Sequence, residues 1–116
     1  MNCGHPSAYL VDLDDQLVEL AGHEHPALGT GSAKPAFRPS ERQLHPGERL
    51  VLLTDGILER TTEGGGTFGL DGLRGALERV ESPTAPATAM AIQRAVTDCW
   101  AEPLEDDATV VVLAVA

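Results

Sequence analysis

The stretch that decides the fold is Arg49-Leu50-Val51-Leu52-Leu53-Thr54-Asp55-Gly56, in which an almost unbroken apolar run ends at an Asp-Gly pair. Such a run is typical of a strand buried on both faces, because a strand with one wet face alternates apolar and polar residues. A second run of this kind, residues 108–115, follows Asp106-Asp107 near the end of the chain. We therefore expect two central strands, each with an acidic residue at one end.

The chain before the first central strand alternates β-favouring segments with turn residues. Residues 8–11 and 16–20 flank an acidic turn at residues 12–15, which predicts a hairpin. Residues 22–39 are rich in Gly, Pro, His and Ser and predict a long loop. Residues 37–44 are a candidate strand. The Pro-Gly pair that follows predicts a tight turn into the first central strand.

Between the two central strands, apolar residues recur at the three- and four-residue spacing of a helix. One helix is expected after the triple glycine at residues 64–66, with Pro83 and Pro86 ending it. A second is expected over residues 88–101, closed by Pro103. The apolar faces consist of Leu70, Leu73, Leu77 and Val80 in the first helix, and Ala91, Ile92, Ala95, Val96 and Cys99 in the second.

Strands followed by two helices and a last strand are typical of an α+β domain, with the helices on one face of a mostly antiparallel sheet. A chain of 116 residues has room for one such domain. The last strand is expected beside the strand at residues 49–54. If the two are antiparallel, the end of one faces the beginning of the other, and Asp55 and Asp106 share one edge of the sheet.

The composition narrows the classes of partner. Eighteen acidic and eight basic residues give a formal charge of −10, which argues against nucleic acid or an anionic membrane as the main partner and favours cations. The apolar runs are shorter than the roughly 20 residues of a membrane span, and no secretion signal is evident, so we expect a cytoplasmic protein. Cys3 and Cys99 form no C-x-x-C pair and are expected to be reduced thiols.

Two carboxylates at one edge indicate a possible cation site. They would repel each other, and a divalent cation between them would offset that repulsion. Hard oxygen ligands suit Mg²⁺ or Mn²⁺, and two such ions about 3.5–4 Å apart can direct water onto a phosphoryl group. An Asp-Gly pair after a strand is more often only a turn. The spacing alone therefore leaves both interpretations of Asp55 open.

Other polar residues carry weaker signals. His23 and His25, with Glu24 between them, have a spacing compatible with a transition-metal site, but histidines in such loops are more often solvated. Glu59 and Arg60 follow the Asp-Gly turn, where helix capping and solvated charge explain them equally well. We therefore leave these residues out of the predicted metal site.

Several short motifs occur in a recognisable order. Asn2-Cys3-Gly4-His5-Pro6 is similar to N-A-G-H-P, Leu53-Thr54-Asp55-Gly56-Ile57-Leu58-Glu59 to Y-T-D-G-V-x-E, and Asp106-Asp107-Ala108-Thr109 to D-D-x-T. P-L-G, L-x-P-G-D-R and F-G motifs are matched by residues 26–29, 44–49 and 68–69. With this order and coverage, the chain resembles the PPM (protein phosphatase type 2C) family, in particular bacterial serine/threonine phosphatases of the stage II sporulation protein E type.

The resemblance implies a fold, an activity and a site. Residues 1–116 would form the C-terminal portion of one catalytic domain, an α-β-β-α sandwich. Asp55 and Asp106 would be catalytic metal ligands in a two-metal Mn²⁺ or Mg²⁺ site, where a metal-bound hydroxide hydrolyses phosphoserine or phosphothreonine. Asp107 would belong to the metal site through hydrogen bonding more than through direct ligation, and Thr109 would help to orient these residues.

The family's D-x-x-G-H-G motif does not occur in the sequence, so the N-terminal metal-binding half of the domain is expected to be missing. Exposed sheet edges or faces would then favour a homo-oligomer. The resemblance also implies a phosphorylated protein substrate, often a STAS-type anti-sigma-factor antagonist. Two alternatives stay open: a catalytically inactive phosphatase-like interaction module, and an α+β domain whose carboxylates are only surface turns.

Overall fold

A computed structural model describes most of the chain, namely residues 2–20, 24, 25, 27, 29, 30 and 39–116. Four strands of this part form an antiparallel sheet in the order β3-β2-β5-β6, and two short strands form a separate parallel pair. The strands are β1 (Asn2–Cys3), β2 (Ala8–Val11), β3 (Leu17–Leu20), β4 (Glu24–His25), β5 (Arg49–Leu53) and β6 (Val110–Ala114), and the helices are α1 (Asp55–Leu58), α2 (Gly69–Leu77) and α3 (Ala85–Asp98).

The two predicted central strands are neighbours in the sheet. All five residues of β5 pair with β6 in antiparallel register, from Arg49 opposite Ala114 to Leu53 opposite Val110. On its other side β5 pairs with β2, which forms the predicted hairpin with β3. This order confirms the expected return of the last strand to the sheet.

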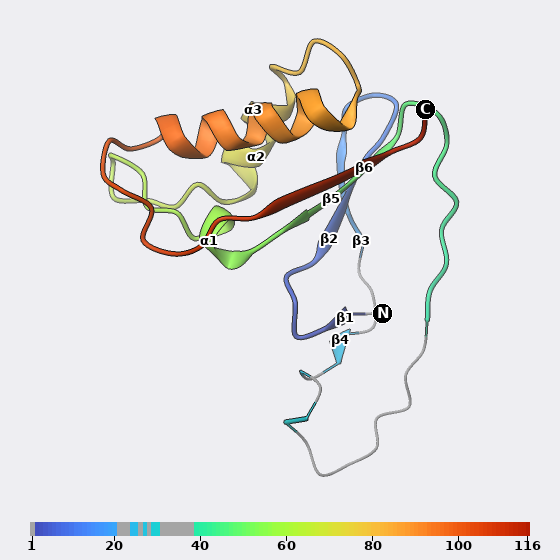
Figure 1. Ribbon diagram of the computed structural model, residues 1–116, viewed down its shortest axis with the longest axis horizontal. Coiled ribbons are helices and arrows are strands. Elements are labelled where there is room, and N and C mark those ends of the chain that lie inside the picture. The colour runs from blue at the N-terminus through green and yellow to red at the C-terminus, as the bar shows by residue number, and fades with distance from the viewer. Residues whose placement is uncertain (1, 21–23, 26, 28, 31–38) are drawn as a thin grey trace.

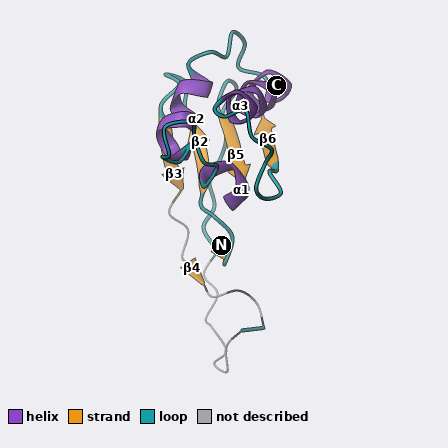
Figure 2. Ribbon diagram, turned by 90° about the vertical axis from the view of Figure 1, so that its left-hand side faces the viewer, coloured by secondary structure: helices purple, strands orange, loops and turns teal. Residues whose placement is uncertain are grey.

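Helices α2 and α3 lie together on one face of this sheet, and no helix of the described chain covers the other face (Figure 1). The end-on view in Figure 2 shows the same two layers. Because side chains alternate between the faces of a strand, every second residue of β2 and β5 points toward the helices. The core between the layers contains Tyr9, Val11, Val51, Leu53, Ile57, Phe68, Leu73, Ala76, Leu77, Ile92 and Val96.

The opposite face of the sheet is apolar and open over β5 and β6, whereas Leu10 of β2 is buried there. The expectation that β5 is buried on both faces is wrong for this chain, because Leu50 and Leu52 are only partly buried while the alternate residues of the strand are buried. Their partners in β6, Leu113 and Val111, are 51% and 48% exposed. The apolar run of β5 therefore has a cover on only one side in this structure.

The helix boundaries correct two predictions about proline. Helix α2 ends at Leu77, before either proline, and Pro86 lies in the first turn of α3 rather than beyond the end of α2. Proline is tolerated there because the first amides of a helix have no partner within the helix. Thr84 caps α3 by accepting the N–H of Ala87 at 3.3 Å. The second helix thus starts earlier than predicted.

The segment before β5 also differs from the prediction. Its described part, residues 39–44, forms no strand and is almost entirely exposed, because it pairs with no other strand that would supply ladder hydrogen bonds. The predicted turn at residues 45–48 is confirmed, since the N–H of Glu48 donates to the carbonyl of His45 at 3.0 Å. The predicted long loop lies mostly outside the described residues.

Arginine 49 is the largest side chain buried within the helix-covered face. It is 1% exposed and lies at the start of β5. One guanidinium nitrogen donates to the hydroxyl of Thr88 on α3 at 3.2 Å, and another is paired with the carboxylate of Asp15 in the hairpin turn. These bonds compensate for the removal of the charge from water and connect the hairpin, β5 and α3.

Candidate metal site at the ends of two strands

The end of β5 and the beginning of β6 lie side by side at one edge of the sheet. The N–H of Thr54 donates to the carbonyl of Thr109 at 3.1 Å, which continues the ladder one step beyond the strands. Asp55 follows Thr54 directly, and Asp106 and Asp107 closely precede Thr109. The structure therefore brings together the two acidic segments that the sequence predicts at one edge.

The hydroxyl of Thr54 joins the two segments. It donates to the carbonyl of Asp107 at 3.1 Å and accepts the N–H of Thr109 at 2.9 Å. Gly56 completes the contact, because a Cβ at this position would lie 2.4 Å from the carbonyl oxygen of Asp107. Only glycine permits such a close approach of the two backbones, so the Asp-Gly pair does more than end the strand.

The three predicted metal-site carboxylates are all exposed. Asp55 begins the four-residue helix α1, which the sequence analysis did not predict, and Asp106 accepts the N–H of Asp107 at 2.7 Å. Within the described residues, no group of three or more His, Cys, Asp or Glu side chains could hold a metal ion. The carboxylates share an edge, and they do not form a closed metal site by themselves.

Sequence reasoning underestimated Arg60. The sequence indicates helix capping or a solvated charge, but the side chain is 3% exposed and its guanidinium contacts the segment that leads to Asp106. No local pattern distinguishes it, because its partners lie about forty residues further along the chain. Glu59 is exposed at the C-terminus of α1, as expected for a solvated charge.

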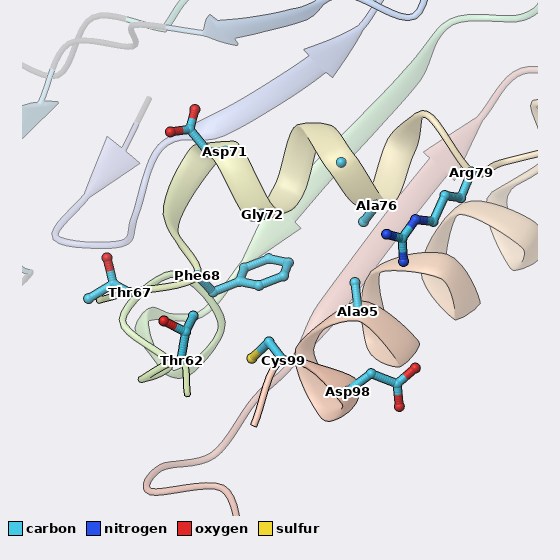
Figure 3. Close-up of a pocket in the computed structure, with 11 residues that line it drawn as sticks. Thr62, Thr67, Phe68, Asp71, Gly72, Ala76, Arg79, Ala95, Asp98 and Cys99 are labelled. Atoms are coloured by element: carbon cyan, nitrogen blue, oxygen red, sulfur yellow. The ribbon is translucent and has the colours of Figure 1, made fainter. Parts of the chain in front are cut away.

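Two cavities lie at different places on the molecule. One of about 130 Å³ opens at the acidic edge and is lined by Gly56, Glu59, Arg60, Glu105 and Asp106. Another of about 440 Å³ lies between α2 and α3, where the ring of Phe68 fills the space beside Gly72 (Figure 3). The second cavity is in the helix layer, and the predicted site residues do not line it.

The sequence analysis also considered two histidines, the cysteines and possible membrane spans. The interpretation of His23 and His25 lies outside what the structure describes, because the placement of His23 and of the His25 side chain is not described. Cys99 is partly buried at the end of α3, with its thiol 3.2 Å from the carbonyl of Val96. No described helix is long and apolar enough to span a membrane.

The antiparallel sheet with two helices on one face is shared with part of solved type 2C phosphatase domains. The phosphatase domain of Bacillus subtilis SpoIIE, in its manganese-presoaked form, aligns with 97% of this chain at a TM-score of 0.67 and 20% identity. The SiaA-PP2C domain of Pseudomonas aeruginosa aligns with 95% of it at a TM-score of 0.73 and 26% identity. The predicted fold class is therefore confirmed.

The family model of stage II sporulation protein E matches residues 1–116, and the chain belongs to this family. The alignments cover only 47% of the SpoIIE chain and 43% of the SiaA chain, so these residues span less than half the length of either. No curated protein matches the sequence significantly. The resemblance inferred from the order of the motifs is confirmed.

Proposed function

We propose that the protein containing these residues is a metal-dependent serine/threonine protein phosphatase, and that Asp55 and Asp106 are the catalytic ligands supplied by this chain. The supporting observation is the meeting of the two carboxylate-bearing strand ends at one edge, in a chain of this family. Asp107 has a supporting role in the proposal, because its carbonyl and N–H both take part in the hydrogen bonds that hold the edge together.

The donor set fits a hard cation. Asp55, Asp106 and Asp107 offer only carboxylate oxygens and are exposed, which suits Mg²⁺ or Mn²⁺ better than a softer metal. Bound at this edge, such ions would neutralise phosphoryl charge and activate water for hydrolysis. Because no closed ligand group occurs among the described residues, the proposal requires further ligands from an N-terminal portion of the domain, beyond these 116 residues.

The residues of this chain have defined tasks in the proposal. Thr54 and Gly56 hold the two acidic segments at a fixed separation, so that the carboxylates need little reorganisation when cations bind. The edge is open to solvent, which leaves room for the phosphorylated side chain of a protein substrate. We propose a STAS-type anti-sigma-factor antagonist as that substrate, with the reaction taking place in the cytoplasm.

The open face of the sheet leads to a proposal about assembly. Val111 and Leu113 of β6 are 48% and 51% exposed, and their partners Leu52 and Leu50 in β5 are only partly buried. In isolation, we propose, this chain forms a homo-oligomer by burying the surface against a second copy, because apolar area removed from water contributes about 25 cal/mol per Å². In the longer protein, the N-terminal portion of the same domain would take that place.

A catalytically inactive interaction module is the alternative function. The observation that favours it is the incomplete ligand set among the described residues, combined with a large apolar surface suited to binding. In this alternative the carboxylates are surface groups, and their removal affects neither phosphate release nor metal binding. The two functions therefore differ in what substitutions of Asp55 and Asp106 do.

The deciding experiment measures phosphate release from a phosphoserine protein by the longest natural form of the protein in the presence of Mn²⁺. We expect hydrolysis that falls at least about 100-fold in Asp55→Asn and in Asp106→Asn, because even groups supporting a metal ligand are typically worth 10–100-fold. Asp71→Asn is the matched control, since Asp71 is an exposed aspartate on α2, away from the edge. Equal rates in all four proteins, or no hydrolysis by the wild type, would leave the interaction module as the better description.

A further inference from the structure

The guanidinium of Arg60 binds a turn of backbone far away in the sequence. It donates to the carbonyl of Pro103 at 2.7 Å and to that of Trp100 at 3.3 Å, and it also bonds the carbonyl of Glu102. Its central carbon lies 5.4 Å from the centroid of the Trp100 ring, a distance at which the cation is attracted to the ring face. One arginine thus binds three backbone carbonyls within residues 100–103, the segment that follows α3.

Neighbouring residues strengthen the same connection. The hydroxyl of Thr61 donates to the carboxylate of Glu105 at 2.9 Å. The N–H of Glu63 donates to the carbonyl of Cys99 at 3.2 Å. The segment after α1 and the segment after α3 are therefore joined by several bonds, and Arg60 is their buried centre.

Both joined segments are connected directly to the candidate metal site. Arg60 follows α1, which begins with Asp55, and the segment that it binds runs through Glu105 to Asp106. Arg60 and Asp106 also line the same cavity of about 130 Å³. The backbone carbonyl of Arg60 accepts the N–H of Phe68 at 2.8 Å, so the arginine is attached to the beginning of α2 as well.

We infer that Arg60 is a positioning residue that holds the Asp106 segment against α1, so that Asp55 and Asp106 are correctly placed for a divalent cation. The inference rests on the proposed function, because it assumes that these two carboxylates bind the metal. Arginine suits the task because its planar guanidinium presents five donors in a fixed arrangement, whereas the ammonium of lysine is a compact charge without that arrangement. Arg60 acts through the backbone and is given no contact with substrate.

The test follows cation binding in this chain by NMR, through the broadening of amide signals as Mn²⁺ is titrated into the millimolar range. In the wild type we expect broadening localised around Asp55 and Asp106, and none in Asp106→Asn. Arg60→Lys should raise the Mn²⁺ midpoint by about tenfold or more, the usual effect of removing a group that supports a ligand. Hydrogen exchange should also accelerate in residues 100–109 while α3 stays protected.

Arg49→Lys is the matched control, because Arg49 is the other buried arginine among the described residues, is also hydrogen-bonded, and lies at the opposite end of β5. It should lower stability and leave the Mn²⁺ midpoint unchanged. Equal midpoints in Arg60→Lys and the wild type, or equal shifts in both arginine variants, would overturn the positioning role alone. If broadening is absent in the wild type or persists in Asp106→Asn, these carboxylates do not bind the cation in this chain and the inference fails, whereas the proposed function is decided by phosphate release from the longer protein.

A second variant covers the case in which Arg60→Lys does not fold. Thr61→Val removes the neighbouring bond to the Glu105 carboxylate and leaves the arginine in place. We expect a shift of the Mn²⁺ midpoint in the same direction, by a few-fold. An unchanged midpoint in a folded Thr61→Val protein would contradict the claim that this connection positions Asp106.

Discussion

The two faces of the four-stranded sheet are both apolar, but helices of the described chain cover only one of them. On the helix side, Val51 and Leu53 are almost inaccessible beneath α2 and α3. On the other side, Leu113 and Val111 are about half exposed although they sit in the same strand pairing. Residues of similar chemistry, adjacent in one ladder, therefore have very different environments.

The helix-covered face stabilises the chain by itself, whereas the open face is available to a partner. Burial on the helix side contributes to the stability of these residues alone, since apolar area is removed from water by the chain's own helices. The open side contributes little until something covers it. The candidate metal site lies at the ends of β5 and β6, at the edge shared by both faces of the sheet. A partner that covers the open face would therefore also reach this site.

The largest effect is expected from substitution on the covered face. Leu53→Ala should lower the free energy of unfolding by about 2–5 kcal/mol, because it leaves a cavity in a fully packed core. Leu52→Ala, its neighbour on the open face, should cost less than half as much, since Leu52 is only partly buried. Urea unfolding at low protein concentration measures both. Equal losses would show that the two faces are covered alike in solution.

A substitution on the open face should change the free energy of unfolding less, but it should clearly weaken self-association. Leu113→Lys places a charge in the middle of the apolar surface and should weaken self-association at least tenfold, as measured by sedimentation equilibrium. The free energy of unfolding of the monomer should change by no more than about 0.5 kcal/mol, as is usual at exposed positions.

Gln93→Lys is the control for this charge, because Gln93 is exposed on α3 in the helix layer. It adds the same charge and should leave the self-association unchanged. A wild-type chain that stays monomeric at high concentration would contradict the proposed homo-oligomer. Equal weakening by both substitutions would indicate that net charge, rather than the open face, controls association.

The central strands and their acidic ends could be predicted from the sequence because buried strands have an apolar composition. The runs at β5 and β6 are too apolar for exposed strands, and antiparallel pairing then requires Asp55 and Asp106 to share an edge. The same runs also predicted burial on both faces, which is wrong for this chain. An apolar run predicts that a strand is buried. It does not indicate whether the residues that bury the strand belong to these 116 residues.

Other features were beyond sequence reasoning for physical reasons. Pro86 is compatible with ending one helix or with starting the next, and only the Thr84 cap, formed in three dimensions, decides between them. The burial of Arg60 depends on carbonyls of residues 100–103, whose approach follows from the packing of α3 on the sheet. A polar residue whose partners are distant backbone groups leaves no periodic signal.

The smallest effect is expected at the start of β5, where the covered face begins. Glu48 precedes the buried Arg49, and its carboxylate accepts the N–H of His45 at 2.9 Å. This hydrogen bond, with those from the His45 ring and Arg42 and despite partial desolvation, lowers the pKa of Glu48 below its ordinary value of 4.5. A group whose pKa is lower in the folded chain contributes stability above about pH 4.5 that is lost as the pH falls through the folded value.

Glu48→Gln should therefore be less stable than the wild type at pH 7, and the difference should shrink as the pH is lowered below 4.5. Thermal unfolding of both proteins between pH 7 and pH 3 measures this convergence. Glu63→Gln, at an exposed position in the loop before α2, should run parallel to the wild type over the same range. A constant gap between Glu48→Gln and the wild type would show that the glutamate holds the turn by shape alone.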